Sequence, residues 1–241
     1  MEHAFFYSNL TPLNAELHKD LKISGTQSYE FAAKVNSLPL TTGEFAEACK
    51  EYPIAFAKIG ERQFVPVAVL GLENAENSFV DESGRWNARY IPAFARRYPF
   101  IPAQGEDEQS LTVCIDSSCP RFNNGDGEPL FVEGAPSTYL SGVVTFLQEY
   151  QQYSQRTRQF GKSLVDLELL VERQANCTTQ DGRQFHLTGL WLVDDAALQA
   201  LDQSRVRELF VSGELALIYL HMTSMSNLNY LMQRKVDPQV P

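Results

Sequence analysis

Apolar and polar residues alternate along the first half of the chain in patterns that predict short β-strands. The stretches "IAFAKI" (54–59) and "VPVAVLGL" (65–72) are rich in apolar and β-branched residues, and "SLTVCIDSS" (110–118) alternates with a period of two. Asp81–Gly84 has the composition of a turn between two strands. We therefore expect antiparallel sheet within residues 1–120.

A helical period replaces this pattern after residue 136. The longest run begins at Ser137 or Thr138, which suit the N-cap, and its apolar residues recur at intervals of three, four and seven. These residues are Tyr139, Val143, Phe146, Leu147, Tyr150, Tyr153 and Phe160. A hairpin with its turn at Asp181-Gly182 is expected next. A helical segment opened by Asp194 or Asp195 and ended by Gly213 follows, and residues 214–236 predict one closing helix, with Arg234 and Lys235 at the negative end of its dipole.

Three further segments carry local signals. Leu13, Leu17 and Leu21, four residues apart, predict a helical turn. Thr41 or Thr42 is expected to cap a short helix, with Glu44 at the capping-box position. Residues 121–136 are rich in Gly, Asn, Asp and Pro and are predicted to form a surface loop.

Because strands precede helices instead of alternating with them, the fold class is predicted to be α+β. We expect an antiparallel sheet in the N-terminal half, packed with helices concentrated in the C-terminal half. The organisation is expected to be a single domain over residues 1–241, sheet-rich in 1–120, a loop in 121–136 and helix-rich in 137–241.

Composition and charge narrow the class of protein. Apolar residues make up 44 % and charged residues 21 % of the 241 positions, as in ordinary globular proteins. The formal net charge of −10 repels nucleic acid, so no nucleic-acid partner is expected. No apolar stretch is long enough to span a membrane, and no signal peptide is visible. A cytoplasmic location is therefore expected, with surface association through another export route left open.

The cysteines and the usual catalytic motifs give no reaction centre. Cys49, Cys114, Cys119 and Cys177 contain no C-x-x-C pair and are expected to be free thiols, although a Cys114–Cys119 bridge stays open. Phosphate-binding glycine loops and the G-x-S-x-G motif are absent from the sequence. The four histidines stand far apart in the sequence. We therefore expect no catalytic residue, no metal ligand and no cofactor.

The segment "GRWNARYIPAFARRYPF" (84–100) concentrates five aromatic residues and four arginines in seventeen positions. It is expected to contain a short helix entered at Pro92, with Phe94 and Tyr98 inward and Arg96 and Arg97 outward. One interpretation is a core wall, with internal ion pairs to "GEDE" (105–108); the other is a surface that docks an anionic partner. Under the second interpretation the candidate binding residues are Arg85, Trp86, Arg89, Tyr90, Arg96, Arg97 and Tyr98.

Several long stretches resemble the bacterial SapC family. They are "FAAKVNSLPLTTGEFAEACKEYPIAFAK", "VPVAVLGLENAENSFVDESGRWNARYIPAFARRYPF", "LTVCIDSSCP" and the C-terminal "LTGLWLVDDAALQALDQSRVRELFVSGELALIYLHMTSMSNLNYL". The resemblance covers nearly the whole chain. It implies an association with surface-layer formation or export and with outer-membrane uptake systems, and it brings no established catalytic residues.

Three functional hypotheses follow. The first is a non-catalytic binding or accessory protein of a bacterial surface-layer or outer-membrane uptake system that recognises a protein, peptide or small-molecule partner through the 84–100 segment. The second is an enzyme, metal-dependent in one form, with a site assembled between the two halves around His186 and His221. The third is a self-assembling surface-layer protein, so homo-oligomers stay open. The sequence favours the first.

Overall fold

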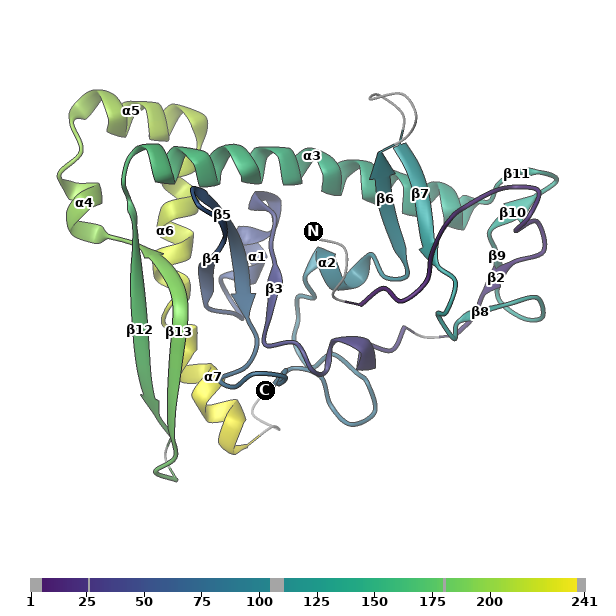
Figure 1. Ribbon diagram of the computed structural model, residues 1–241, viewed down its shortest axis with the longest axis horizontal. Helices are drawn as coiled ribbons and strands as arrows, with labels where there is room; N and C mark the ends of the chain where they lie inside the picture. The colour runs from purple at the N-terminus through teal and green to yellow at the C-terminus, as the bar shows by residue number, and fades with distance from the viewer. Residues whose placement is uncertain (1–5, 26, 105–110, 180, 238–241) are drawn as a thin grey trace. The chain divides into compact units, whose positions relative to one another are not determined.

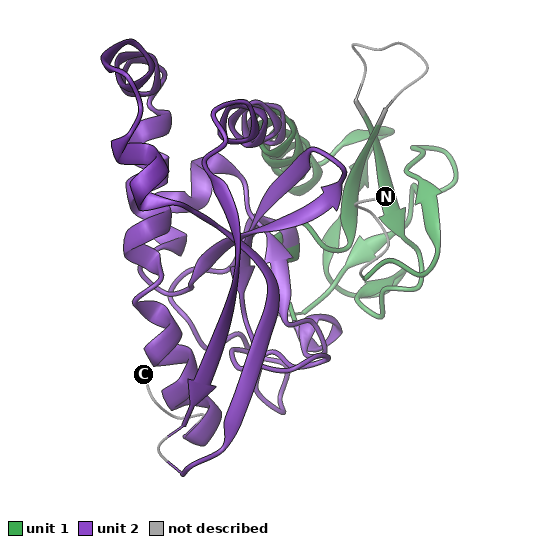
Figure 2. Ribbon diagram, turned by 60° about the vertical axis from the view of Figure 1, so that its left-hand side comes forward, with its two compact units in different colours: residues 1–28, 95–152 green, residues 29–94, 153–241 purple. Residues whose placement is uncertain are grey.

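The computed structural model describes residues 6–25, 27–104, 111–179 and 181–237 (Figure 1). Two compact units are each built from two separate stretches of chain (Figure 2). Unit 1 comprises residues 1–28 and 95–152, and unit 2 comprises residues 29–94 and 153–241. The long helix α3, Thr138–Asp166, contributes residues to both units. The single-domain organisation therefore stays a prediction, to which the Discussion returns.

Unit 1 is built from short antiparallel strands. One sheet has the order β1-β7-β6, and a second has the order β8-β2-β9. The strands of these sheets and of a small hairpin are β1 (Leu10–Pro12), β2 (Lys22–Ile23), β6 (Phe100–Gln104), β7 (Leu111–Asp116), β8 (Phe122–Asn123), β9 (Glu128–Pro129), β10 (Phe131–Val132) and β11 (Ala135–Pro136).

Of two local predictions in unit 1, one is wrong and one is confirmed. The predicted loop 121–136 contains the four short strands β8 to β11, because β8 and β9 both pair with β2 and satisfy their backbone groups there. The helical turn predicted over Leu13–Leu21 is present as a single turn, closed by the His18 N–H donating to the Asn14 backbone oxygen at 3.0 Å and capped by the Asn14 side chain. Its Oδ1 accepts hydrogen bonds from the backbone N–H groups of Glu16 and Leu17, and the Leu17 side chain is exposed.

The core of unit 1 joins strands to the first half of α3. Its buried residues are Ile23, Phe100, Ile115, Leu130, Leu140 and Leu147. Ser137 begins the helix as predicted, since its Oγ accepts a hydrogen bond from the Leu140 N–H at 3.1 Å.

Unit 2 contains the largest sheet, with the strand order β12-β13-β4-β5-β3. Its strands are β3 (Ser37–Pro39), β4 (Ile54–Gly60), β5 (Gln63–Val69), β12 (Leu170–Thr178) and β13 (Gln184–Val193). The predicted late hairpin is confirmed as β12–β13, and it joins β4 by pairing of Trp191 with Phe56. The sheet thus draws two strands from the second half of the sequence.

Short helices surround this sheet, and most of their predicted ends are confirmed. Asp194 caps α4, Gly213 ends α5 at φ +80°, and Thr41 and Glu44 form a capping box. The predicted closing helix is two helices, α6 and α7, because the chain breaks at Met225-Ser226. The bounds are η1 (Glu30–Ala32), η2 (Thr42–Glu44), α1 (Phe45–Ala48), α2 (Ala93–Arg96, across the two units), α4 (Asp195–Gln199), α5 (Gln203–Ser212), α6 (Glu214–Ser224) and α7 (Asn227–Val236). The α+β class is confirmed.

Phe56 on β4 lies at the centre of the unit 2 core. Its ring contacts Phe160 of α3, with centroids 6.0 Å apart, and His221 of α6 at 5.0 Å. Phe160 also contacts Phe45 at 6.0 Å. Since one side chain of β4 meets both helices, α3 and α6 pack on the same face of the sheet.

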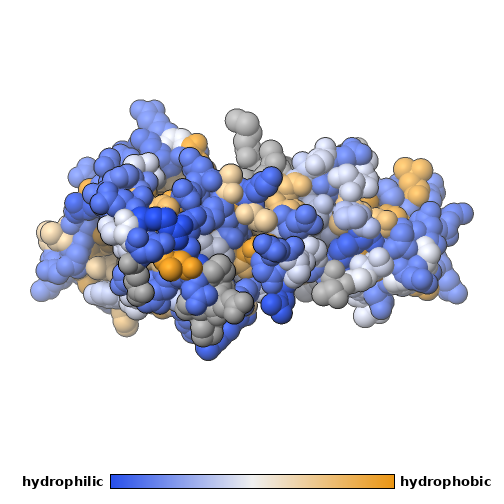
Figure 3. Space-filling view, turned by 90° about the horizontal axis from the view of Figure 1, so that it is seen from below, coloured by the Kyte–Doolittle hydropathy of each residue, from blue (hydrophilic) through white to orange (hydrophobic). Residues whose placement is uncertain are grey.

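The face of the molecule in Figure 3 is mostly hydrophilic, with apolar residues in small separate patches. Within the described ranges, no helix has the length and apolarity that crossing a membrane requires. Cys49, Cys114, Cys119 and Cys177 are free thiols, which leaves no Cys114–Cys119 bridge.

Candidate functional site

An open cavity of about 690 Å³ in unit 2 is lined by residues 85–89 of the predicted binding segment. We call it the arginine cavity. The other lining residues come from the end of the α1 region and from α7. The full lining is Lys50, Glu51, Arg85, Trp86, Asn87, Ala88, Arg89, Asn227 and Tyr230. Residues far apart in the sequence therefore meet at one concave surface.

Asp81 fixes the turn that leads into this cavity. Its carboxylate accepts hydrogen bonds from Ser83 Oγ at 2.6 Å, from the Arg85 N–H at 3.0 Å and from Arg85 Nε at 3.1 Å. The hydrogen bond from Ser83 is the largest of the effects that hold the pKa of Asp81 below its usual value. Gly84 takes φ +75°, which favours glycine. The predicted turn thus presents Arg85 at the cavity edge.

Trp86 anchors the loop in the core of unit 2. Its side chain is buried, and Nε1–H donates to the Tyr52 hydroxyl at 2.9 Å. The Tyr52 hydroxyl in turn donates to the backbone oxygen of Tyr90, and burial raises the pKa of Tyr52. Tyr29 packs edge-on against the indole, with centroids 5.5 Å apart. Trp86 therefore shapes the cavity wall and leaves little indole surface for a partner.

Glu44 holds the other end of the loop. This buried carboxylate accepts hydrogen bonds from the Tyr90 hydroxyl at 2.8 Å and from the Ala93 N–H at 2.6 Å. Its second oxygen accepts from the N–H and hydroxyl of Thr41 at 2.7 and 2.9 Å. The residue that completes the predicted capping box thus also fixes Tyr90 and the start of α2.

The cavity has an excess of cations at its rim. Lys50, Arg85 and Arg89 are positively charged, against the single carboxylate of Glu51 in the lining. Lys50 pairs with Glu47 at 2.7 Å, and Arg85 pairs with Asp81 at 3.1 Å while staying 77 % exposed. The exposed Arg89 makes no hydrogen bond or ion pair with any residue that the structure describes. Cations therefore outnumber carboxylates in the lining itself, but Glu47 and Asp81 compensate two of them, and Arg89 is the cation of the lining without an ion-pair partner in the described ranges.

Helix α7 is fixed beside the cavity by buried polar contacts. Asn227 Nδ2 donates to the backbone oxygens of Cys49 and Tyr52 at 2.7 and 3.2 Å. Arg234 Nη1 donates to the Tyr230 hydroxyl at 2.7 Å, and its guanidinium lies 4.7 Å from the Phe79 ring centroid. Arg234 and Lys235 lie in the last turn of α7, as predicted. The Arg234 side chain is also 2 % exposed and packs in the core, which the sequence did not indicate.

The other predicted binding residues do not line the arginine cavity: Tyr90 belongs to unit 2, and Arg96, Arg97 and Tyr98 belong to unit 1. Arg96 is exposed and lies over the Phe146 ring at 5.1 Å, while Tyr98 contacts Tyr7 at 5.6 Å. Arg97 was expected to point outward, and this is wrong: it is 3 % exposed and lies 4.8 Å from the Tyr150 ring centroid. The predicted ion-pair partners at 105–108 lie outside the described residues.

The histidines of the enzyme hypothesis have different surroundings. His221 is buried, with Nδ1–H donating to the Ile54 oxygen at 2.7 Å and Nε2 accepting from the Val193 N–H at 3.1 Å. Burial lowers its pKa to about 4. His186 is exposed, and its Nδ1 forms a hydrogen bond with Asn176 Oδ1 at 2.6 Å. Among the residues that the structure describes, no group of three or more His, Cys, Asp or Glu side chains could hold a metal ion.

Sequence reasoning missed the residues that complete the cavity. Lys50, Glu51, Asn227 and Tyr230 belong to no motif, and only the tertiary fold brings them to Arg85 and Arg89. The one available signal was the spacing of Tyr230 and Arg234, which places the two side chains one helical turn apart on the same face of a helix.

Fold and site together define an α+β protein with an open cavity that Lys50, Arg85 and Arg89 line. A family model described as SapC matches residues 13–231, and the chain belongs to the SapC family. Neither a curated protein nor a solved structure matched the chain.

Proposed function

We propose that the protein is a non-catalytic accessory protein that recognises an extended acidic segment of a partner protein in the arginine cavity. The observation that carries the proposal is the concentration of Lys50, Arg85 and Arg89 around one concavity. Guanidinium groups bind carboxylates in planar, bidentate geometry, so the natural partner chemistry is a peptide with Asp or Glu side chains.

A neighbouring cavity supports an extended partner. This second cavity, about 700 Å³, shares Arg85 and Asn87 with the arginine cavity, so the two adjoin at this turn. Its lining mixes acids with the cations Arg183, Arg234 and Lys235. A peptide lying across both cavities would meet Arg89 and Arg85 first and the mixed charges of the second cavity next.

The cellular setting of the proposal comes from the family. The resemblance to the SapC family implies an association with surface-layer or outer-membrane uptake systems, and in this proposal a protein of such a system supplies the acidic segment. The enzyme and self-assembly hypotheses stay predictions. Elemental analysis of the purified protein tests the first, and light scattering with and without calcium tests the second.

Fluorescence anisotropy with labelled peptides tests the proposed function. A peptide of alternating Glu and Gly should bind, and its Lys counterpart should not. The Arg85→Ala/Arg89→Ala double variant should bind the acidic peptide at least about tenfold more weakly, a loss of about 1.4 kcal/mol. Added salt should also weaken binding, because the charges at the rim are exposed.

A control variant that loses the same charge elsewhere distinguishes an effect of the arginine cavity from an effect of the protein's net charge. Lys34 and Arg207 are exposed, line neither of these cavities, and have no ion-pair partner among the described residues. The Lys34→Ala/Arg207→Ala variant should therefore bind the acidic peptide like wild type. Equal affinity of both double variants would contradict the proposal.

A further inference from the structure

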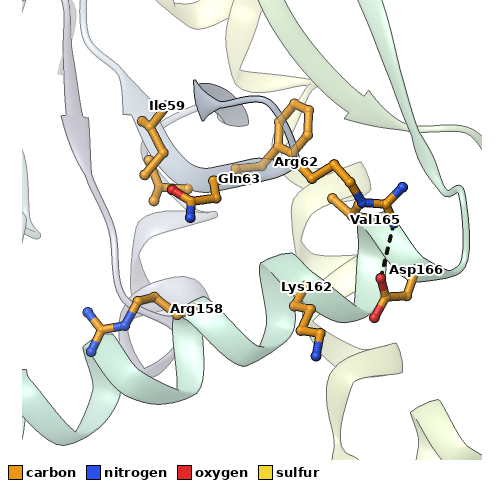
Figure 4. Close-up of a pocket in the computed structure, with 9 residues that line it drawn as sticks. Ile59, Arg62, Gln63, Arg158, Lys162, Val165 and Asp166 are labelled. Carbon is orange, nitrogen blue, oxygen red and sulfur yellow. Dashed lines mark hydrogen bonds and ion pairs between the residues drawn. The ribbon is translucent and has the colours of Figure 1, made fainter.

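A separate cavity of about 410 Å³ lies in unit 2 between the β4–β5 hairpin and the second half of α3 (Figure 4). Its residues are Ile59, Arg62, Gln63, Phe64, Val65, Arg158, Lys162, Val165 and Asp166. None of them lines the arginine cavity. A volume of this size lies in the range of small-molecule pockets.

The floor of this cavity is apolar and fixed by close packing. Gly161 lets α3 approach the hairpin so closely that a Cβ there would lie 2.6 Å from the Phe64 oxygen. The Phe64 ring packs against Trp191, with centroids 4.8 Å apart. Val65 and Val165 continue the apolar lining, and Ile59 stands beside it with 56 % of its surface exposed. A hydrocarbon group would bury this surface.

The ends of the cavity are charged. Arg62 of the hairpin pairs with Asp166 of α3 at 3.2 Å and closes one end (Figure 4). Arg158 and Lys162 stand one helical turn apart on α3, and in Figure 4 both side chains extend from the helix away from the hairpin. Neither makes a hydrogen bond or an ion pair within the described part of the chain. Both residues line the cavity and are exposed, so a head group bound by them would stay in contact with water.

From this arrangement we propose that the cavity binds a free anionic amphiphile: an alkyl chain on the Ile59–Phe64–Val165 surface, with a carboxylate or phosphate head held by Arg158 and Lys162. The apolar floor accounts for the chain, because its burial removes apolar surface from water. The two cations one turn apart account for the sign of the head group. This second site is independent of the peptide recognition proposed for the arginine cavity.

Isothermal titration of the full-length protein tests the proposal with five probes. Decanoate and decyl phosphate, which separate the two head groups, carry both features of the ligand. Decanol and decylamine lack the anionic head group, and inorganic phosphate lacks the alkyl chain. At least one of the two amphiphilic anions should bind at one site per chain, and the other three probes should bind at least about tenfold more weakly. Equal binding of decanol, decylamine or inorganic phosphate would overturn the proposal.

Two variants locate the site. Arg158→Ala/Lys162→Ala should weaken the binding of the anionic amphiphile at least about tenfold, and Ile59→Ser should weaken it through loss of the apolar contact. Both changes are at exposed positions and leave the core intact. The Lys34→Ala/Arg207→Ala control should bind like wild type. Unchanged affinity in both cavity variants, or sedimentation with phosphatidylcholine–phosphatidylglycerol vesicles without binding of either free anion, would exclude a site for a free amphiphile.

Discussion

Glu44 is the residue on which the geometry of the arginine cavity depends most. It is buried, and its carboxylate ties the capping box to Tyr90 and to the start of α2. A carboxylate that accepts hydrogen bonds from several buried donors cannot be replaced by an amide without leaving at least one donor facing the amide NH₂ group.

We therefore expect Glu44→Gln to lower the free energy of unfolding by about 2 kcal/mol, the typical scale of hydrogen bonds to a charged group. Urea denaturation followed by circular dichroism measures this loss. Glu47→Gln is the matched control, since Glu47 is exposed and pairs only with Lys50 at the surface, so its effect should stay below about 0.5 kcal/mol. A Glu44→Gln protein as stable as this control would show that the network contributes little.

His221 gives the fold a defined dependence on pH. Burial lowers its folded-state pKa from 6.5 to about 4, so the unfolded chain takes up the proton first as the pH falls. The His221 contribution to stability is present in full above the unfolded-state pKa. It is lost progressively between 6.5 and about 4. Linkage gives a loss of about 2 kcal/mol between pH 7 and pH 5.

Replacing His221 with Gln should remove this part of the pH dependence, while His186→Gln should keep it because His186 is exposed. The measurement is the free energy of unfolding of the three proteins at the two pH values. A His221→Gln protein that loses as much stability on acidification as wild type would contradict the assignment.

Residue-level sequence reasoning succeeded where the signal was local and failed where it was tertiary. The Asp81–Gly84 turn, the Ser137, Asp194 and Thr41–Glu44 caps and the Gly213 terminus are set by neighbours a few residues away, and all are confirmed. The burial of Arg97 and Arg234 was missed. Aromatic partners from elsewhere in the sequence cover both guanidinium groups, and charge alone argues for exposure.

At the scale of elements, two glycines on α3 show where this helix packs closely against its neighbours and where it does not. Gly161 and Gly142 lie on this one helix in opposite surroundings. A Cβ at Gly161 would meet the Phe64 oxygen at 2.6 Å, whereas a Cβ at Gly142 would meet nothing within 4 Å. Alanine substitutions at these two glycines therefore separate the effect of packing on stability from the effect of helix propensity.

Gly142→Ala should therefore stabilise the protein by roughly 0.5–1 kcal/mol, because alanine favours the helix. Gly161→Ala should destabilise it by about 1–2 kcal/mol, since the clash with β5 backbone outweighs the same gain. Thermal unfolding of both variants checks the two signs. Stabilisation by both substitutions would mean that α3 and the hairpin are not in close contact.

Element-level prediction was limited by pairing over long distances in sequence. The β12–β13 hairpin was predicted from its turn, but its membership of the sheet of β4 depends on the Trp191–Phe56 pairing, for which the sequence carries no signal. Residues 121–136 look like a loop by composition. Their strands exist because β2, about a hundred residues earlier, offers backbone partners.

At the scale of the whole molecule, α3 contributes to two cores. Leu147 is buried in unit 1 and Phe160 in unit 2, on one continuous helix of 29 residues. If either half of the helix unfolds, one core loses its packing. The half that stays folded then ends in a new, free helix terminus. We therefore predict that the chain behaves as a single domain and unfolds in one calorimetric transition. Two well-separated transitions in wild type would show that the units fold independently.

The central claim is that the arginine cavity recognises an acidic partner, and the two tryptophans make it directly measurable. Trp86 lines that cavity, whereas Trp191 packs behind Phe64 at the cavity beside α3. Their indole N–H resonances in a ¹H–¹⁵N spectrum, assigned with Trp191→Phe, report the two sites separately. Titration with the alternating Glu–Gly peptide should shift the Trp86 signal and leave Trp191 in place, and Arg85→Ala/Arg89→Ala should abolish the shift. A Trp86 resonance that does not respond to the acidic peptide, or that responds equally in the double variant, would contradict the claim.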